Sequence, residues 1–272
     1  MRSRLAMGPV LVLGAGDVGS AAAHVLFTAG FRVALHDGPA APTAPRRGMA
    51  FADAFFDGQA RLAGVTAVRV EGTSALTDLL AARCGIPFLV GTVEEAYVGA
   101  PWHALVDARM RKRAKPEDAR SAAPLVIGLG PGFVAGGNCH VAIETSWEAL
   151  GELITTGPTR PLRGEPQPVG GAGRERTVHA PADGVFRTER RIGDWVSSGI
   201  VGTLDGVPIL APLPGVLRGL IRDGVPVRAG AKLVEVDPRG DPALCFGLGE
   251  RPKRTALAVL GALRTAMEHP RP

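Results

Sequence analysis

Residues 10–37 read VLVLGAGDVGSAAAHVLFTAGFRVALHD and decide the fold of the first half of the chain. The apolar run over Val10–Leu13 predicts a buried β-strand. The glycine turn that follows has the spacing G-x-G-x-x-G, and the small-residue stretch over Val18–Ala29 predicts a helix that ends at Gly30, a favoured C-cap residue. A second apolar run over Phe31–His36 predicts another strand, which leads into Asp37. The stretch therefore predicts a β-loop-α-β unit that ends on an acid.

Each residue of this motif has a mechanical reason. Gly14 permits the tight turn, Gly16 lets a pyrophosphate approach the backbone, and Gly19 lets the helix pack close to the strand. The helix from Asp17 offers N–H groups and the positive end of its dipole to a phosphate. Asp37 stands where a carboxylate binds a ribose 2′-hydroxyl. These residues predict a nucleotide or dinucleotide site; the alternative is a close-packed βαβ unit that binds nothing in its crevice.

The bulk composition describes a globular chain of one large domain or two ordinary ones, with 272 residues, 46% apolar and 21% charged. Because no apolar run approaches the ~20 residues of a membrane span and the N-terminal apolar segment contains the glycine turn, we expect a cytoplasmic protein with no membrane partner. The three cysteines lie far apart without a C-x-x-C pair, which argues against disulfides and a metal site. A single Tyr leaves no stacking platform for bases, so we expect no nucleic acid partner despite the net charge of +5.

Arginines supply two further candidate contacts. The densest basic run, RMRKRAK over residues 109–115, fits a solvated helix end or a contact with an anionic partner. Arg46 and Arg47 could reach a phosphate at the crevice or pair with acids, and the sequence leaves both interpretations open.

Strand-like and helix-like segments alternate through the N-terminal half, which is typical of an α/β domain with a Rossmann-like sheet. We predict this nucleotide-binding domain over residues 1–154. Its strands are expected at residues 10–13, 32–36, 65–70, 87–90 and 125–129, and its helices at residues 18–29, 74–83 and 102–113.

A second glycine turn, GLGPGFVAGG over residues 128–137, follows the strand Leu125–Leu129. It places Gly130 and Gly132 at the carboxyl end of a strand, where α/β sheets bind ligands, so we predict that they form the opposing wall of the site. His140 and Glu144 follow and share one face in either a strand or a helix. They could act as a catalytic acid–base pair, orient a ligand or contribute to a metal site, for which two ligands are too few; a structural hydrogen-bonded pair is the alternative.

The C-terminal half contains a duplication. After a Pro- and Gly-rich linker or loop over residues 155–175, HAPADGVFRTERRIGDWVSSG (179–199) recurs as LAPLPGVLRGLIRDGVPVRAG (210–230), at an offset of 31 residues. Two such halves predict a small all-β domain over residues 176–240 with approximate two-fold symmetry. The repeat resembles biotinyl/lipoyl-type barrel-sandwich-hybrid domains, but residues 203–207 at the central hairpin contain no lysine, so we expect neither biotin nor lipoate. An amphipathic helix over Arg254–Met267 lies in the closing segment, residues 241–272.

In the order of its pieces, the chain resembles the YqeB-type proteins of the selenium-dependent molybdenum hydroxylase system. The pieces are GAGDVGSAAAHVLFTAGFRV, PRRGMAFADAFFDG, APLVIGLGPGFVAGGNCHVAIET, VGGAGRER and the duplicated APADG and APLPG segments. The resemblance covers about residues 10 to 262 and implies an accessory role in maturing a molybdenum hydroxylase. It also implies that the partners are the client enzyme or its maturation factors. A molybdopterin dinucleotide, which is often the cofactor of such enzymes, is then one candidate for the nucleotide, and NAD is the other.

Three functions follow from these observations. The preferred one is a nucleotide-binding accessory protein that delivers or inserts the cofactor of a molybdenum hydroxylase. The second is an NAD-dependent oxidoreductase, for which Asp37 would hold NAD and His140 with Glu144 would be the only candidate acid–base pair. The third is a non-catalytic scaffold for an oxidoreductase complex.

Overall fold

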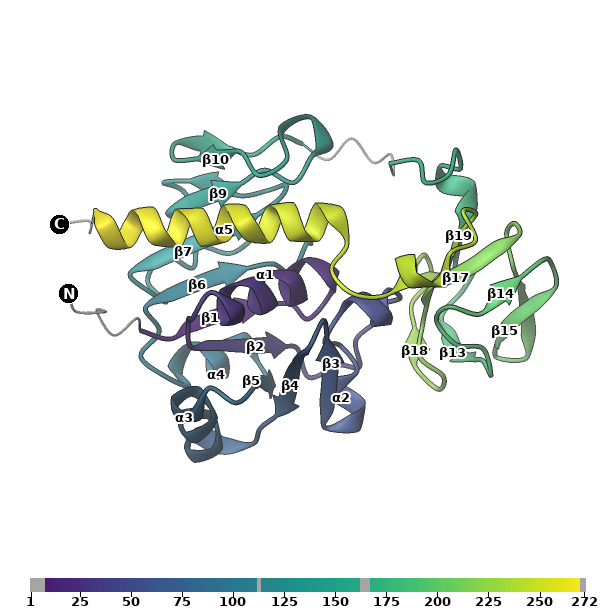
Figure 1. Ribbon diagram of the computed structural model, residues 1–272, viewed down its shortest axis with the longest axis horizontal. Coiled ribbons are helices and arrows are strands. Elements are labelled where there is room, and N and C mark those ends of the chain that lie inside the picture. Colours follow the sequence, from purple (N-terminus) through teal and green to yellow (C-terminus); the bar gives the residue numbers. More distant parts are fainter. Residues whose placement is uncertain (1–7, 112–113, 162–166, 270–272) are drawn as a thin grey trace. The chain divides into compact units, whose positions relative to one another are not determined.

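The computed structural model describes residues 8–111, 114–161 and 167–269, which belong to two compact units (Figure 1). The first, called the sheet unit, comprises Met1–Pro39, Phe51–Leu162 and Leu248–Pro272. The second, called the β unit, comprises Ala40–Ala50 and Arg163–Gly247. Parts of two predicted segments, residues 112–113 of the basic run and residues 162–166 of the linker, lie outside the described residues.

Nine strands form one mixed sheet in the sheet unit. They are β1 (Val10–Leu13), β2 (Val33–Asp37), β3 (Gln59–Leu62), β4 (Val65–Arg69), β5 (Ile86–Val90), β6 (Ala104–Asp107), β7 (Leu125–Leu129), β9 (Val141–Ile143) and β10 (Leu153–Ile154). Their order is β10-β9-β7-β6-β1-β2-β5-β4-β3. All neighbours from β9 to β4 pair in parallel, whereas the edge strands β10 and β3 are antiparallel to theirs. The two short strands β8 (Val134–Ala135) and β11 (Gly157–Pro158) form a separate ladder.

Helices cover both faces of this sheet because its central strands are apolar on both sides. Along β1, Val10 and Val12 pack in one core cluster with α1 (Asp17–Thr28) and α5 (Glu250–Glu268), which lie beside each other in Figure 1. Leu11 and Leu13 pack in the other cluster with α3 (Gly72–Ala82) and α4 (Val93–Val98). The alternation follows from the two-residue period of a strand. Each fully buried Leu or Val contributes roughly 1.5–3 kcal/mol. The remaining helix, α2 (Ala54–Asp57), precedes β3.

One predicted helix is wrong in a way that matters for function. Residues 102–113 were expected to be helical, but Ala104–Asp107 form β6, a fully buried strand between β1 and β7. A strand in the middle of a parallel sheet is apolar on both faces, so its sequence does not alternate between apolar and polar residues. Periodicity therefore cannot distinguish it from a buried helix, and this is why the helix prediction was wrong. The carboxyl end of β6 therefore lies next to the glycine turn that follows β1.

The strand order creates a switch point at this edge. From β1 the chain places β2, β3, β4 and β5 on one side, and it then crosses to place β6 and β7 on the other side. In open α/β sheets, the crevice at the carboxyl ends of such strands is where ligands bind. The adjacent carboxyl ends of β1 and β6 thus mark the position at which a site is expected.

The β unit consists of two four-stranded antiparallel sheets. Its strands are β12 (Thr177–His179), β13 (Gly184–Arg187), β14 (Trp195–Val196), β15 (Ile200–Leu204), β16 (Val207–Leu210), β17 (Gly215–Leu220), β18 (Pro226–Val227) and β19 (Lys232–Asp237). The sheet orders are β12-β19-β17-β14 and β16-β15-β13-β18. The repeat offset of 31 residues carries β12, β13, β14 and β15 onto β16, β17, β18 and β19, so each sheet is the repeat image of the other.

The predicted fold class is nevertheless wrong. The chain is a mixed α/β protein with a large nine-stranded mixed sheet, several antiparallel sheets and a C-terminal helix, and the Rossmann-like domain followed by a small biotinyl/lipoyl-like barrel is not what forms. Two physical causes account for the difference. First, the antiparallel strands β3 and β10 extend the parallel sheet at both edges. Second, the segment Ala40–Ala50 joins the duplicated strands through a buried ion pair, so the duplicated strands alone do not make up the β unit.

Candidate functional site

The glycine turn after β1 has a different geometric requirement at each glycine. Gly14 has φ +95, and a Cβ there would lie 2.8 Å from Arg109 Cα and 2.9 Å from the oxygen of Ala108. A Cβ on Gly19 would collide with the carbonyl oxygen of Gly14, so this glycine is required for helix packing. A Cβ on Gly16 would meet nothing within 4 Å. The backbone at Gly16 is therefore open to the approach of a ligand, while its neighbours are fixed by packing.

The N-terminus of α1 follows directly from this open glycine. Gly16 is the N-cap, and the first helical hydrogen bond runs from Ser20 N to its carbonyl oxygen. Asp17, the first helical residue, accepts a hydrogen bond from Val18 N at 3.0 Å. The helix dipole and the N-terminal N–H groups give this end a positive potential suited to an anion.

Asp37 lies against the same turn. As the last residue of β2, it accepts hydrogen bonds from Ala15 N (3.3 Å) and Gly38 N (2.9 Å). Burial raises the pKa of its carboxyl group, and these two hydrogen bonds oppose the rise. The structure thus brings Gly14, Gly16 and Asp37 together, which is the geometry needed to hold a diphosphate and the neighbouring ribose.

The second glycine turn lies at the same edge, at the carboxyl end of β7. Gly130 and Gly132 have φ values of +84 and +92. A Cβ on Gly130 would lie 2.8 Å from Thr145 Oγ1 and 3.3 Å from Met110 Cε, so the turn is closely packed by its neighbours. Since β1, β6 and β7 are parallel neighbours, the two glycine turns flank the carboxyl end of β6.

His140 and Glu144 are not brought together. They flank β9 at opposite ends, so about 13 Å of extended chain separates them. His140 Nδ1 accepts a hydrogen bond from Val126 N at 2.9 Å, at the amino end of β7. The buried carboxylate of Glu144 accepts hydrogen bonds from three backbone N–H groups, those of Thr145 (2.7 Å), Ser146 (2.9 Å) and Arg160 (2.7 Å). In these contacts both side chains accept hydrogen bonds from backbone N–H groups, and they do not contact each other.

The sequence interpretation missed two acids, Asp107 at the end of β6 and Glu117 after it, whereas their partners Arg109 and Arg111 belong to the basic run over residues 109–115. Asp107, a buried side chain at the end of the strand, accepts hydrogen bonds from Arg109 N, Nε and Nη2. Arg111 forms a bidentate pair with Glu117, with distances of 2.6 and 2.7 Å, and this hydrogen bonding holds the pKa of Glu117 at about 2. The signal was present in the sequence, because ALVD over residues 104–107 is an apolar run that ends on an acid, as does VALHD over residues 33–37.

His36 is another residue that the sequence interpretation missed. It pairs with Leu13 in β1, which pairs in turn with Asp107, so the three side chains point to one face of the sheet. Its Nε2 donates a hydrogen bond to the oxygen of Gly91 at 3.0 Å, and in the described part of the chain its buried Nδ1 has no partner. Burial lowers the pKa of His36, so the ring is a neutral hydrogen-bond acceptor at this edge.

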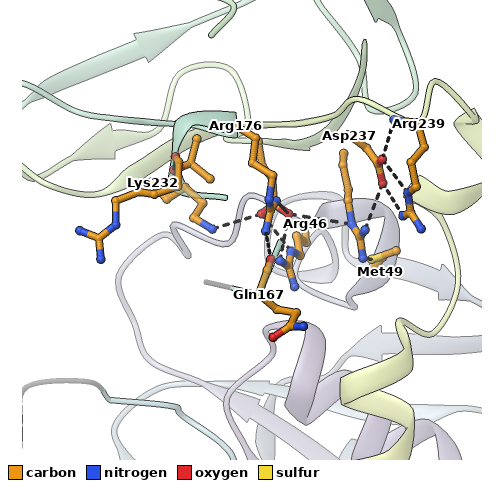
Figure 2. A network of polar contacts seen from close by, with 11 residues as sticks. Arg46, Met49, Gln167, Arg176, Lys232, Asp237 and Arg239 are labelled. Carbon is orange, nitrogen blue, oxygen red and sulfur yellow. Dashed lines mark hydrogen bonds and ion pairs between the residues drawn. The ribbon is translucent and has the colours of Figure 1, made fainter. Parts of the chain in front are cut away.

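The β unit holds a separate network of buried charges (Figure 2). The fully buried carboxylate of Glu235 accepts hydrogen bonds from Arg46 Nε (3.0 Å) and Nη2 (2.9 Å), Arg176 Nη1 (2.5 Å) and Lys232 Nζ (3.1 Å). Burial opposes ionisation of Glu235, but these three cations outweigh it and hold its pKa well below the usual range. Of the two interpretations offered for Arg46, these contacts support pairing with an acid.

Next to Glu235, two further arginines contact Asp237. Arg218 Nη1 lies 3.1 Å and Arg239 Nη2 2.6 Å from its carboxylate. The network thus ties Ala40–Ala50 and η3 (Arg174–Arg176) to β19 within the β unit.

Three observations limit the kinds of site within residues 8–111, 114–161 and 167–269. No group of three or more His, Cys, Asp or Glu side chains is arranged to hold a metal ion. No helix combines the length and the apolar character needed to cross a bilayer. An open hollow of about 710 Å³ in the β unit is lined by both charge signs, including Arg187, Arg190 and Asp223, and so favours no single class of ligand.

Comparison with known proteins gives one informative relative. No protein-family model matches the chain. The uncharacterized protein YqeB of Escherichia coli strain K12 is 36% identical over 262 residues, which is 95% of this chain and 48% of that protein. The chain therefore spans about half the length of the curated relative that it matches.

Two solved structures align with the chain only weakly. The product-bound ectoine utilization protein EutE (DoeB) from Ruegeria pomeroyi is 14% identical with a TM-score of 0.24, over 85% of each chain. A point mutant of MHPCO is 15% identical with a TM-score of 0.18, over 66% of this chain and 46% of that one. TM-scores this low support no conclusion about fold or function.

Proposed function

We propose that this homologue of YqeB binds a nucleotide or dinucleotide at the carboxyl edge of its nine-stranded sheet and holds it as an accessory protein in the maturation of a molybdenum hydroxylase. The observation that carries the binding proposal is the open backbone at Gly16 beside the carboxylate of Asp37, at the switch point of the sheet. The client hydroxylase or its maturation factors would be the partners, in the cytoplasm.

The residues at this edge fit the dinucleotide part of a molybdopterin dinucleotide. The diphosphate would lie against Gly16 and the N-terminus of α1, and Asp37 would accept a hydrogen bond from a ribose hydroxyl. Two buried polar atoms at the same edge, His36 Nδ1 and Ser146 Oγ, have no partner within the described residues and offer further hydrogen bonds. The molybdenum chemistry of such a cofactor would belong to the client enzyme, and this chain would bind and release it.

The maturation role rests on the order of the sequence motifs, which resembles that of the YqeB-type proteins of the selenium-dependent system. The homology to the uncharacterized protein YqeB supports the resemblance to these proteins and carries no role of its own. Delivery requires binding and release, with no proton transfer by the chain. The separation of His140 from Glu144 agrees with this, because the acid–base pair that an oxidoreductase would use is not assembled by these residues.

The binding proposal is tested by calorimetry with ADP and 2′-deoxy-ADP. We expect the wild type to bind ADP more tightly than 2′-deoxy-ADP, and Asp37→Asn to weaken ADP binding roughly tenfold or more, since a hydrogen bond to a charged group contributes roughly 1.5–3 kcal/mol. Asp78→Asn, which makes the same charge change on the exposed surface of α3, is the control and should bind as the wild type does. Equal affinities of Asp37→Asn and Asp78→Asn would refute the role of Asp37.

The maturation proposal is tested by purifying the protein from its native host and identifying by mass spectrometry what accompanies it. A molybdopterin dinucleotide or a molybdenum hydroxylase subunit is expected, and deletion of the chain should leave that hydroxylase without its cofactor. Bound NAD together with substrate-dependent hydride transfer would replace the proposal with the oxidoreductase function.

A further inference from the structure

The segment after β6 contains a strained residue between two arginines. Met110 has φ +50, a value that L-residues other than Asn and Asp adopt rarely. Among the residues that the structure describes, three other non-glycine residues share a positive φ, each with a local reason. Ala63 and Asp205 precede a glycine in a hairpin turn, and Arg83 ends α3. Met110 lies in neither kind of position. Strain of this type persists where surrounding contacts hold it, often at functional sites.

Around Met110, the two arginines share the same two carboxylates. Arg109 Nε and Nη2 lie 3.0 and 2.5 Å from Asp107, and Arg111 Nη1 and Nη2 lie 2.6 and 2.7 Å from Glu117. Each arginine also reaches the second acid, at 3.1 Å from Arg109 to Glu117 and 3.4 Å from Arg111 to Asp107. The four side chains therefore form one network.

This network lies between the two glycine turns. A Cβ on Gly14 would be 2.8 Å from Arg109 Cα, and a Cβ on Gly130 would be 3.3 Å from Met110 Cε. The Asp107 end of the network is fixed by the sheet, since Asp107 is the last residue of β6. An anionic ligand that lies on the first glycine turn would thus have Arg109 as its neighbour, and Arg111 shares the carboxylates of Arg109.

The two acids differ in a way that separates their roles. The side chain of Asp107 is 3% exposed and belongs to a central strand, whereas that of Glu117 is 62% exposed and lies outside any helix or strand. Asp107 is therefore a permanent partner, and it balances one of the two arginine charges. Glu117 supplies the second negative charge from an exposed position at which another carboxylate or a phosphate could replace it, because the planar guanidinium fork accepts either group.

We propose that Arg109 and Arg111 recognise a phosphate of the bound nucleotide, and that Glu117 is an internal competitor that occupies their guanidinium groups until that phosphate replaces it. The inference rests on the proposed nucleotide site and adds to it the side chains that recognise the phosphate and a means by which the chain itself limits affinity. Cofactor delivery needs such a limit, since the ligand must also leave.

The test compares Glu117→Gln with the adjacent control Asp118→Asn by calorimetry with ADP and with uncharged adenosine. Asp118 carries the same charge and is also exposed, but it pairs with Arg120. We expect Glu117→Gln to bind ADP about two- to fivefold more tightly, the range of an exposed ion pair, and Asp118→Asn to bind as the wild type does. Arg111→Gln should weaken ADP binding about tenfold or more and abolish the gain from Glu117→Gln, while adenosine affinity stays constant in every variant.

Two results would overturn the inference and are distinguishable from each other. If the wild type binds ADP through Asp37 but Glu117→Gln and Asp118→Asn have the same affinity, the competitor role fails and the nucleotide site stands. If neither the wild type nor Glu117→Gln binds ADP, the proposed nucleotide site fails and the inference fails with it.

Discussion

Replacing Glu235 with alanine removes a carboxylate that accepts hydrogen bonds from three cations of the β unit and has Arg218 Nε as a further ion-pair partner at 3.9 Å. Glu235 is fully buried, while Arg46, Arg176 and Lys232 are 29%, 3% and 27% exposed at their side chains. Removing one partner of a buried ion pair costs roughly 3–5 kcal/mol, because the remaining charge stays buried without compensation. Since Arg46 and Lys232 can turn partly toward water, we expect the lower end, about 3 kcal/mol. At ~1.4 kcal/mol per factor of ten, this raises the population of the opened β unit about a hundredfold.

Hydrogen exchange followed by mass spectrometry measures this effect locally. Peptides that cover β17 and β19 should exchange about a hundredfold faster in Glu235→Ala, because exchange of a protected strand reports the free energy of its opening. Glu235→Gln keeps one acceptor oxygen without the charge and should give a smaller change. Arg228→Ala is the control in the same unit, since Arg228 pairs with Asp183 on the surface with 90% of its side chain exposed, and it should leave the exchange unchanged.

The pH dependence gives an independent check of the same reasoning. Because the pKa of Glu235 is depressed in the folded chain, its stabilising contribution is fully present above the ordinary glutamate pKa of 4.5 and is lost as the pH falls toward the folded value. The difference between wild type and Glu235→Ala should therefore be constant from pH 7 to about 5 and narrow below 4.5. Equal exchange in Glu235→Ala and Arg228→Ala, or a difference that widens on acidification, would refute this account of the network.

Three other substitutions separate binding from packing. Gly16→Val should leave thermal stability close to that of the wild type, because a side chain there meets nothing, but it should abolish ADP binding in calorimetry by blocking the phosphate. Gly19→Ala should strongly lower the melting temperature, since its Cβ would collide with the carbonyl of Gly14; a stable Gly19→Ala protein would contradict the packing role. His140→Ala should lower the free energy of unfolding by about 1–3 kcal/mol, because Val126 N loses its acceptor, and it should leave ADP affinity unchanged. Loss of ADP binding in His140→Ala would instead assign His140 to the site.

Local mechanics made the glycine turn predictable from sequence. The predicted bounds of β1 and β7, Val10–Leu13 and Leu125–Leu129, are those of the structure, and α1 begins and ends within one residue of its prediction. The positive φ of Gly14 and the contact of Gly19 with the Gly14 carbonyl arise within this local unit. These local requirements were sufficient to predict the unit, although Ala108 and Arg109 also pack against its glycines.

Long-range pairing decided the parts that the sequence did not reveal. Arg46 and Glu235 are 189 residues apart, and no local pattern connects them. At the hairpin turn of the edge strand β3, Ala63 has a positive φ that alanine rarely adopts, and its carbonyl oxygen accepts a hydrogen bond from His24 Nε2 (3.1 Å), 39 residues earlier in the chain. Such features depend on contacts with distant parts of the chain. For this reason, neither the mixed sheet nor the inclusion of Ala40–Ala50 in the β unit followed from composition or periodicity.

The spacing of His140 and Glu144 shows how conformation decides whether two residues can form a site. Four residues apart in a helix, their Cβ atoms would be about 5–6 Å apart, but in β9 about 13 Å of strand separates them. The acids that do organise the sheet edge share a different feature, since Asp37 and Asp107 end β2 and β6, and Glu144 follows β9. Each accepts a backbone N–H from the turn that follows its own strand. An acid at the end of a short apolar run is therefore a better sequence signal for this edge than a pair at helical spacing, and it would have identified Asp107 as the partner of the basic run.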